Sequence, residues 1–85
     1  MSEKSDIQRI VRVRKRIAHR LLQLRSDQGL TQEAVAGRSG LALRHLQKIE
    51  AAQVNLTIES LTRVATALGV DPEDLLSDED QKPIR

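Results

Sequence analysis

The stretch that most constrains the fold is a run of 20 residues in the middle of the chain, from Gln32 to Ala51. Gly40 lies near its centre, where a turn that needs positive φ costs a glycine least. Ala36 is small, at the point where two crossing helices would approach most closely. Four apolar residues have the spacing that would bury them between such helices: Val35, Leu41, Leu46 and Ile49. The run therefore predicts two short helices joined by a tight turn.

The second of these helices presents a polar face as well. Arg44, Gln47 and Lys48 fall opposite Leu46 and Ile49, so they should point away from the core. A buried face opposite a polar, partly cationic face is typical of the second helix of a helix-turn-helix motif, which lies in the DNA major groove. The run thus points to double-stranded DNA as a partner.

Helical signals continue on both sides of this run. Asp6 is placed to cap a first helix that ends near Asp27, before Gly29, and Thr31 caps a second over 32–38. One face of the first helix carries Ile10, Val13, Ile17, Leu21 and Leu24. The third helix covers about 43–51, and Ala42 at its cap position has no side-chain acceptor.

Thr57 caps a fourth predicted helix that ends at Gly69, and Asp71-Pro72 opens a short fifth helix. The inward residues of these two helices are expected to be Ile58, Leu61, Val64, Ala65, Leu68, Leu75 and Leu76. We expect an all-α domain over 6–77, a frayed tail over 1–5 and an acidic, polar tail over 78–85.

The amino-acid composition excludes several classes of protein and of site. With 85 residues the chain suffices for one small domain, and without Phe, Tyr or Trp its core must be aliphatic. Cysteine is absent, so disulfides and thiolate zinc sites are excluded, which fits a cytoplasmic setting. Neither a signal peptide nor a membrane span is apparent. No residue constellation suggests an enzyme, a metal site or a cofactor.

Charge is unevenly distributed along the chain, although the net charge is only +2. The segment from Ile7 to Arg25 holds seven cations and no acid, whereas Asp71 to Asp80 holds six acids and no cation. A basic segment of this kind is either a solvated helix face or a surface that meets a polyanion.

Several short matches resemble the phage repressor and Cro-like (XRE-type) family of DNA-binding domains. They are Arg25 with Gly29-Leu30-Thr31-Gln32, then Ile49-Glu50, then the apolar pattern from Leu61 to Val70. The resemblance covers roughly Ile17 to Leu76 and implies a compact five-helix Cro/C1-repressor-like domain with the motif on its second and third helices. Three positions depart from the family pattern, which favours an apolar residue at Ser39, Gly at Ala52 and Pro at Leu56.

The resemblance assigns roles to individual residues. It implies that Gln32 contacts a phosphate from the start of the second helix, and that Arg25 and Glu50 form a structural bridge between the first and third helices. The backbone around 53–57 would form a second phosphate contact, with Gln53 and Asn55 as side-chain candidates.

The third helix supplies the residues expected to read bases. Arg44 or Lys48 can pair with guanine, and Gln47 with adenine. Leu43 either meets a thymine methyl group or is half covered by the second helix. His45 either reaches a phosphate or packs. These residues complete the predicted DNA-binding set.

The segment 7–13 precedes the family's usual first helix. Its branched apolar residues Ile7, Ile10, Val11 and Val13 alternate with arginines. They either cover the fifth helix, meet a second chain, or belong to an amphipathic helix that simply extends along its own domain. The arginines are also candidates for flanking phosphates.

The leading hypothesis is a homodimeric, sequence-specific transcriptional regulator that binds an inverted repeat. Relatives dimerise through the fifth helix, and we expect the same here with the N-terminal extension as a supplement. Controller proteins of restriction-modification systems and phage repressors both fit. An antitoxin, which binds a protein partner through the N-terminal helix or acidic tail as well as its operator, is the alternative. Membrane-surface binding ranks last because the core needs the apolar face of the basic segment.

Overall fold

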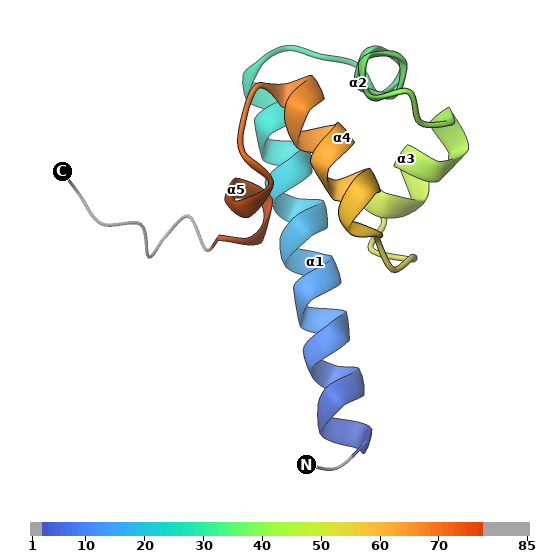
Figure 1. Ribbon diagram of the computed structural model, residues 1–85, viewed down its shortest axis with the longest axis vertical. Coiled ribbons are helices and arrows are strands. Elements are labelled where there is room, and N and C mark those ends of the chain that lie inside the picture. The colour runs from blue at the N-terminus through green and yellow to red at the C-terminus, as the bar shows by residue number, and fades with distance from the viewer. Residues whose placement is uncertain (1–2, 78–85) are drawn as a thin grey trace, which may run out of the picture.

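The computed structural model describes residues 3–77, and these form five helices and no strand. The helices are α1 (Glu3–Asp27), α2 (Gln32–Ser39), α3 (Leu43–Glu50), α4 (Ile58–Leu68) and α5 (Pro72–Leu76). Figure 1 shows α2 to α5 gathered around the C-terminal half of α1, while its N-terminal half extends well beyond them. The predicted all-α, five-helix architecture is confirmed. The predictions made for residues 1–2 and 78–85 lie outside the described residues.

The helix ends differ from the predicted ends at three places. Helix α1 begins at Glu3, so Asp6 lies inside it and does not cap it, and residues 3–5 are helical. The sequence Glu3-Lys4-Ser5 contains neither glycine nor proline, so nothing in it stops a helix. Helix α2 includes Ser39, and α3 ends at Glu50 with Ala51 as its cap.

The core is one aliphatic cluster to which all five helices contribute. Its buried members are Ile17, Leu21, Val35, Ala36, Leu46, Ile49, Leu61, Val64, Ala65, Leu68 and Leu75. Leu24 and Leu41 pack against this cluster from partly buried positions. The apolar face predicted for α1 is therefore buried in the core only from Ile17 onward. Ile10 and Val13 are exposed, because the other helices do not extend that far along α1.

Two further apolar residues that were expected inside are exposed. Ile58 is the first residue of α4 and is 79% exposed, although it continues the buried spacing of Leu61 and Val64. Leu76 is the last residue of α5 and is also exposed, while Leu75 beside it is fully buried. Both predictions were wrong for the same reason: helical periodicity gives a face, but it does not say where the neighbouring helices stop.

The N-caps predicted at Thr31 and Thr57 are confirmed by their hydrogen bonds. The hydroxyl oxygen of Thr31 accepts from the backbone N–H of Ala34 at 3.0 Å, and that of Thr57 accepts from Ser60 at 3.0 Å. Ala42 makes no side-chain cap at the start of α3. The start of α3 therefore depends on the burial of its apolar face.

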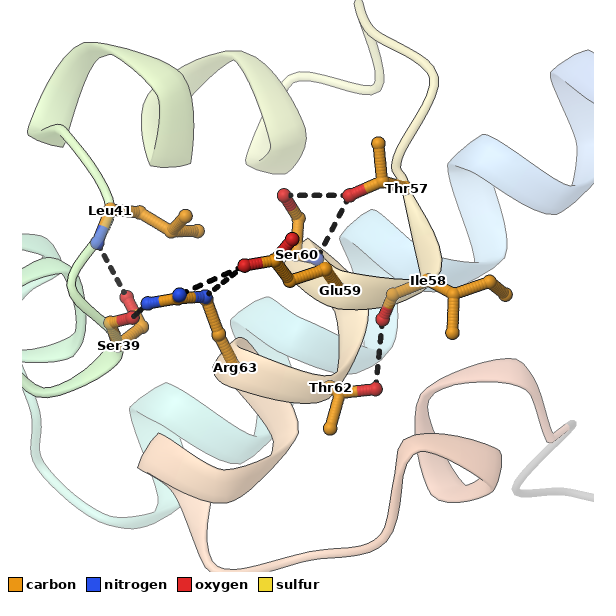
Figure 2. A network of polar contacts seen from close by, with 8 residues as sticks. All are labelled: Ser39, Leu41, Thr57, Ile58, Glu59, Ser60, Thr62 and Arg63. Carbon is orange, nitrogen blue, oxygen red and sulfur yellow. Dashed lines mark hydrogen bonds and ion pairs between the residues drawn. The ribbon is translucent and has the colours of Figure 1, made fainter.

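The turn between α2 and α3 is held against α4 by a polar network (Figure 2). Arg63 on α4 forms an ion pair with Glu59 and donates from Nη1 to the backbone carbonyl of Ser39 at 3.5 Å. The buried hydroxyl of Ser39 donates to the Ala36 carbonyl at 3.1 Å and accepts from the Leu41 N–H at 3.4 Å. These bonds explain how a polar residue occupies a site where the family favours an apolar one.

The loop after α3 contains the only positive φ of a non-glycine residue within the described part of the chain. Ala52 has φ 59°. Its N–H donates to the Ile49 carbonyl, and the next N–H, that of Gln53, donates to the Lys48 carbonyl. This is a Schellman ending, and α1 ends in the same way at Gly29. An L-residue in this conformation costs roughly 1–2 kcal/mol, which glycine avoids.

We therefore expect Ala52→Gly to stabilise the domain by up to about 1 kcal/mol, after the entropy that glycine adds to the unfolded chain is deducted. Gly29→Ala is the matched reverse change, because nothing lies within 4 Å of the added methyl group. It should destabilise by a similar amount. Urea unfolding measures both. An Ala52→Gly variant less stable than the parent would contradict this account of the loop.

Candidate nucleic-acid interface

Helix α3 separates an anchored face from an exposed polar face. Leu46 is fully buried and Ile49 is 3% exposed, whereas Arg44, Gln47 and Lys48 are exposed. Anchoring on one side fixes the direction of the side chains on the other. All three polar residues that were predicted to project from this helix do so.

A buried ion pair positions α3 against α1, as predicted. Arg25 Nε lies 2.8 Å from Glu50 Oε2, and Nη2 lies 3.1 Å from Oε1, which is the bidentate arrangement. Arg25 Nη1 also donates to the Leu30 carbonyl at 2.9 Å. The side chains of Arg25 and Glu50 are only 17% and 8% exposed. The pair therefore joins the end of α1, the following loop and the end of α3.

Gln32 extends this network to the exposed face. Its Nε2 donates to Glu50 Oε1 at 3.0 Å, and its Oε1 accepts from Gln47 Nε2 at 3.3 Å. The Gln32 side chain is thus held between Glu50 at the end of α3 and Gln47 on the exposed face of α3. Gln32 is also the first residue of α2, where the free backbone N–H groups and the helix dipole favour an anion.

Leu43 and His45 are less exposed to solvent, and so to DNA, than the other residues of α3 that were predicted to contact DNA. Leu43 is partly buried and packs against the core cluster, as in the half-covered alternative. The side chain of His45 is also partly buried, and its Nε2 is shielded from solvent without a hydrogen-bond partner among residues 3–77. This geometry favours the packing alternative for His45.

The loop between α3 and α4 brings Gln53 and Asn55 to the surface, where both are exposed. The Oδ1 atom of Asn55 accepts a hydrogen bond of 2.8 Å from Nε of Arg14. Arg14 lies in the part of α1 that precedes the buried Ile17, residues 3–16, which we call the α1 extension. No pattern along the sequence indicates this contact, because it joins residues 41 positions apart. It ties the extension to a loop that was predicted to meet a phosphate.

Not all of the cationic segment forms a surface. Arg20 is 8% exposed, and its Nε donates to the Asp74 carbonyl at 3.3 Å, which joins α1 to α5. Arg25 is engaged with Glu50. Over residues 5–27 of α1, the exposed cations are Arg9, Arg12, Lys15 and Arg16. The charge distribution along the sequence placed Arg20 and Arg25 in the same basic segment as these exposed cations, although both are engaged inside the domain.

No helix within residues 3–77 has the length and apolar character of a membrane span. Over the same residues, His, Asp and Glu side chains do not gather in threes around a position that would suit a metal ion.

Comparisons with known proteins agree with this geometry. A family model described as helix-turn-helix matches residues 21–75. An uncharacterised HTH-type transcriptional regulator, y4dJ of Sinorhizobium fredii, is 37% identical over 71 residues, which are 84% of this chain and 92% of the relative.

Solved structures are similar as well. The restriction-modification controller protein C.AhdI from Aeromonas hydrophila is 34% identical, with a TM-score of 0.71, over 73% of this chain and 94% of the controller. A hypothetical transcription factor from Neisseria is 26% identical, with a TM-score of 0.78, over 81% and 79% of the two chains. The chain therefore belongs to the helix-turn-helix family of the phage repressor and Cro-like (XRE) type, and it is a transcriptional regulator with a helix-turn-helix DNA-binding domain.

Proposed function

We propose that this regulator binds an inverted-repeat operator as a homodimer, with α3 of each copy in the major groove. The observation that carries the proposal is the division of α3 into two faces. Leu46 and Ile49 hold one face in the core, and the other presents Arg44, Gln47 and Lys48 to solvent. An α-helix of this kind fits the major groove, where its side chains can reach base edges.

The exposed groups match the chemistry of base edges. The guanidinium of Arg44 and the ammonium of Lys48 can donate to O6 and N7 of guanine, and the amide of Gln47 can pair with N6 and N7 of adenine. The hydrogen bond from Gln47 to Gln32 restrains the Gln47 amide before DNA arrives. A restrained side chain loses less entropy on binding, so Gln47 would discriminate more sharply than a free one.

Phosphate contacts would fix α3 in register on both sides. The first residue of α2, Gln32, offers helix N-terminal N–H groups, and the exposed loop residues Gln53 and Asn55 offer side-chain amides. Such contacts hold the helix in place but carry no sequence information. Gln32→Ala should therefore weaken binding to all duplexes, with a further loss of discrimination only at the base pair that Gln47 reads, because Gln32 also restrains Gln47.

A two-fold symmetric complex is expected because the base-reading surface of one copy, the exposed face of α3, is small. One helix spans only a few base pairs, so two copies about 34 Å apart on one face of the duplex are expected. Selection of bound sites from random duplex DNA tests this arrangement. We expect inverted repeats whose half-sites are centred about one helical turn apart. Recovery of a single, unrepeated motif, or no enrichment at all, would contradict it.

A further inference from the structure

Arg14 joins the α1 extension to the α3–α4 loop in a way that leaves hydrogen-bond donors unused. Its Nε donates to Asn55 Oδ1 at 2.8 Å. Within residues 3–77 the Arg14 side chain makes no other hydrogen bond and no ion pair, although a guanidinium carries N–H donors on each of its nitrogens. The donors on Nη1 and Nη2 of Arg14 therefore stay available beside an exposed loop residue.

The same hydrogen bond fixes the orientation of the Asn55 amide. A guanidinium donates hydrogen bonds and accepts none, so only the amide oxygen of Asn55 can face it. The amide nitrogen Nδ2, which carries the N–H donors, then points away from Arg14 Nε on a side chain that is exposed. The pair thus presents donors from two elements of the fold, and the oxygens of a DNA phosphate accept hydrogen bonds from such donors.

The charge of Arg14 is not balanced by an acid. Arg25 on the same helix is paired with Glu50 at 2.8 Å. Arg14 is also partly buried, but its partner Asn55 is a neutral amide. Both side chains line a groove between α1 and the α3–α4 loop whose lining residues within 3–77 are mostly apolar and include no acid. Apolar neighbours lower the local dielectric constant, which strengthens the attraction of the guanidinium for an anion.

We propose that Arg14 and Asn55 together bind one phosphate of the DNA backbone, with the guanidinium supplying the charge and the amide a further donor. We call these two side chains the Arg14–Asn55 clamp. The inference rests on the proposed function, because it adds a cation to the phosphate contact proposed for the α3–α4 loop. Arg14 lies outside residues 21–75, which the family model matches, so the helix-turn-helix motif itself does not supply this contact.

The clamp is held at a fixed distance from the base-reading face of α3. The loop leaves α3 along a defined path, because the Gln53 N–H donates to the Lys48 carbonyl, and Asn55 follows two residues later. Helix α1 is fixed to the end of α3 by Arg25 and to the loop by Arg14. The clamp would therefore bind a phosphate beside the groove that α3 enters, and it would hold α3 in register there.

The salt dependence of DNA binding tests the clamp, since each neutralised phosphate contributes about 0.9 to the slope of log affinity against log salt concentration. Arg14→Ala should reduce the slope by about this amount. At low salt it should also weaken binding at least about tenfold, equally for a site recovered by selection and for random duplex. Arg16→Ala is the matched control, because it removes the same charge from an exposed position about 200° around the same helix. Its slope and affinity should stay close to those of the parent chain.

Asn55→Asp separates contact with DNA from a role in folding. The new carboxylate can still accept from Arg14, so the free energy of unfolding should not fall. It also neutralises the guanidinium and removes the amide donors, so DNA affinity should drop further than in Asn55→Ala. Urea unfolding followed by circular dichroism verifies that every variant folds. An Asn55→Asp chain that binds DNA at least as tightly as the Asn55→Ala chain would overturn the clamp.

Equal salt slopes for Arg14→Ala and Arg16→Ala would also overturn it. So would a loss by Arg14→Ala on the selected site alone, since that pattern marks a base contact. The proposed function is tested separately through α3. If Arg44→Ala loses base preference while Arg14→Ala binds like the parent, the clamp fails and the proposed function stands. If selection enriches no repeated motif, the proposed function fails whatever the salt slopes are.

Discussion

Replacing Glu50 with Ala is expected to lower the free energy of unfolding by about 3–5 kcal/mol, the usual effect of leaving a buried charge without its partner. Glu50 accepts from Arg25 Nε at 2.8 Å, from Arg25 Nη2 at 3.1 Å and from Gln32 Nε2 at 3.0 Å. In the variant, Arg25 loses both carboxylate bonds and keeps the bond from Nη1 to the Leu30 carbonyl. Helix α3 of the variant also loses the anchor that joins it to α1.

The exposed pair between Glu59 and Arg63 is a matched control. It has the same 2.8 Å separation between nitrogen and oxygen, but the side chains of Arg63 and Glu59 are 49% and 72% exposed. Glu59→Ala should therefore cost less than about 1 kcal/mol. Urea unfolding followed by far-UV circular dichroism suits both variants, since the chain has no aromatic residue for fluorescence. Equal losses from the two changes would show that burial does not set the strength of the Arg25–Glu50 bridge.

Arg44→Ala and Lys48→Ala should each weaken binding to a site recovered by selection by about 1–3 kcal/mol, with a much smaller loss on random duplex. The reason is that a lost base contact affects only the correct base, whereas a lost phosphate contact affects every sequence. Arg38→Ala is a control of equal charge, because Arg38 is exposed in the last turn of α2, away from Gln32. Fluorescence anisotropy of labelled duplexes at fixed salt concentration provides the comparison.

If Arg44→Ala loses as much on random duplex as on the selected site, Arg44 is a phosphate contact. The same result for both Arg44 and Lys48 would remove the proposed base-reading role from the exposed face of α3.

Much of the fold could be predicted because its signals are local. Thr31 and Thr57 occupy cap positions, and apolar spacing over Leu61 to Leu68 identifies the buried face of α4. The bridge between Arg25 and Glu50 was predicted through family resemblance, and the structure confirms it. In each case, a few neighbouring residues or a short motif were enough to predict the feature.

The errors share a different origin, which is long-range geometry. Exposure of Ile58 and Leu76 depends on where neighbouring helices end, and the burial of Arg20 depends on the position of α5. The contact between Arg14 and Asn55 joins an extension to a loop, and no periodicity encodes it. Ala52 shows a further case, since the departure from Gly was visible in the sequence but its positive φ was not.

The most direct test of the central claim, that the exposed face of α3 reads base pairs, is a thermodynamic cycle between Arg44 and the selected site. Affinities of the parent and Arg44→Ala chains are measured for that site and for each of its single-base-pair variants. At one base pair per half-site, we expect the penalty for the wrong base to fall by at least about 1 kcal/mol in the Arg44→Ala chain, and at the other base pairs we expect it to stay unchanged. Identical penalties for both chains at every base pair would contradict it.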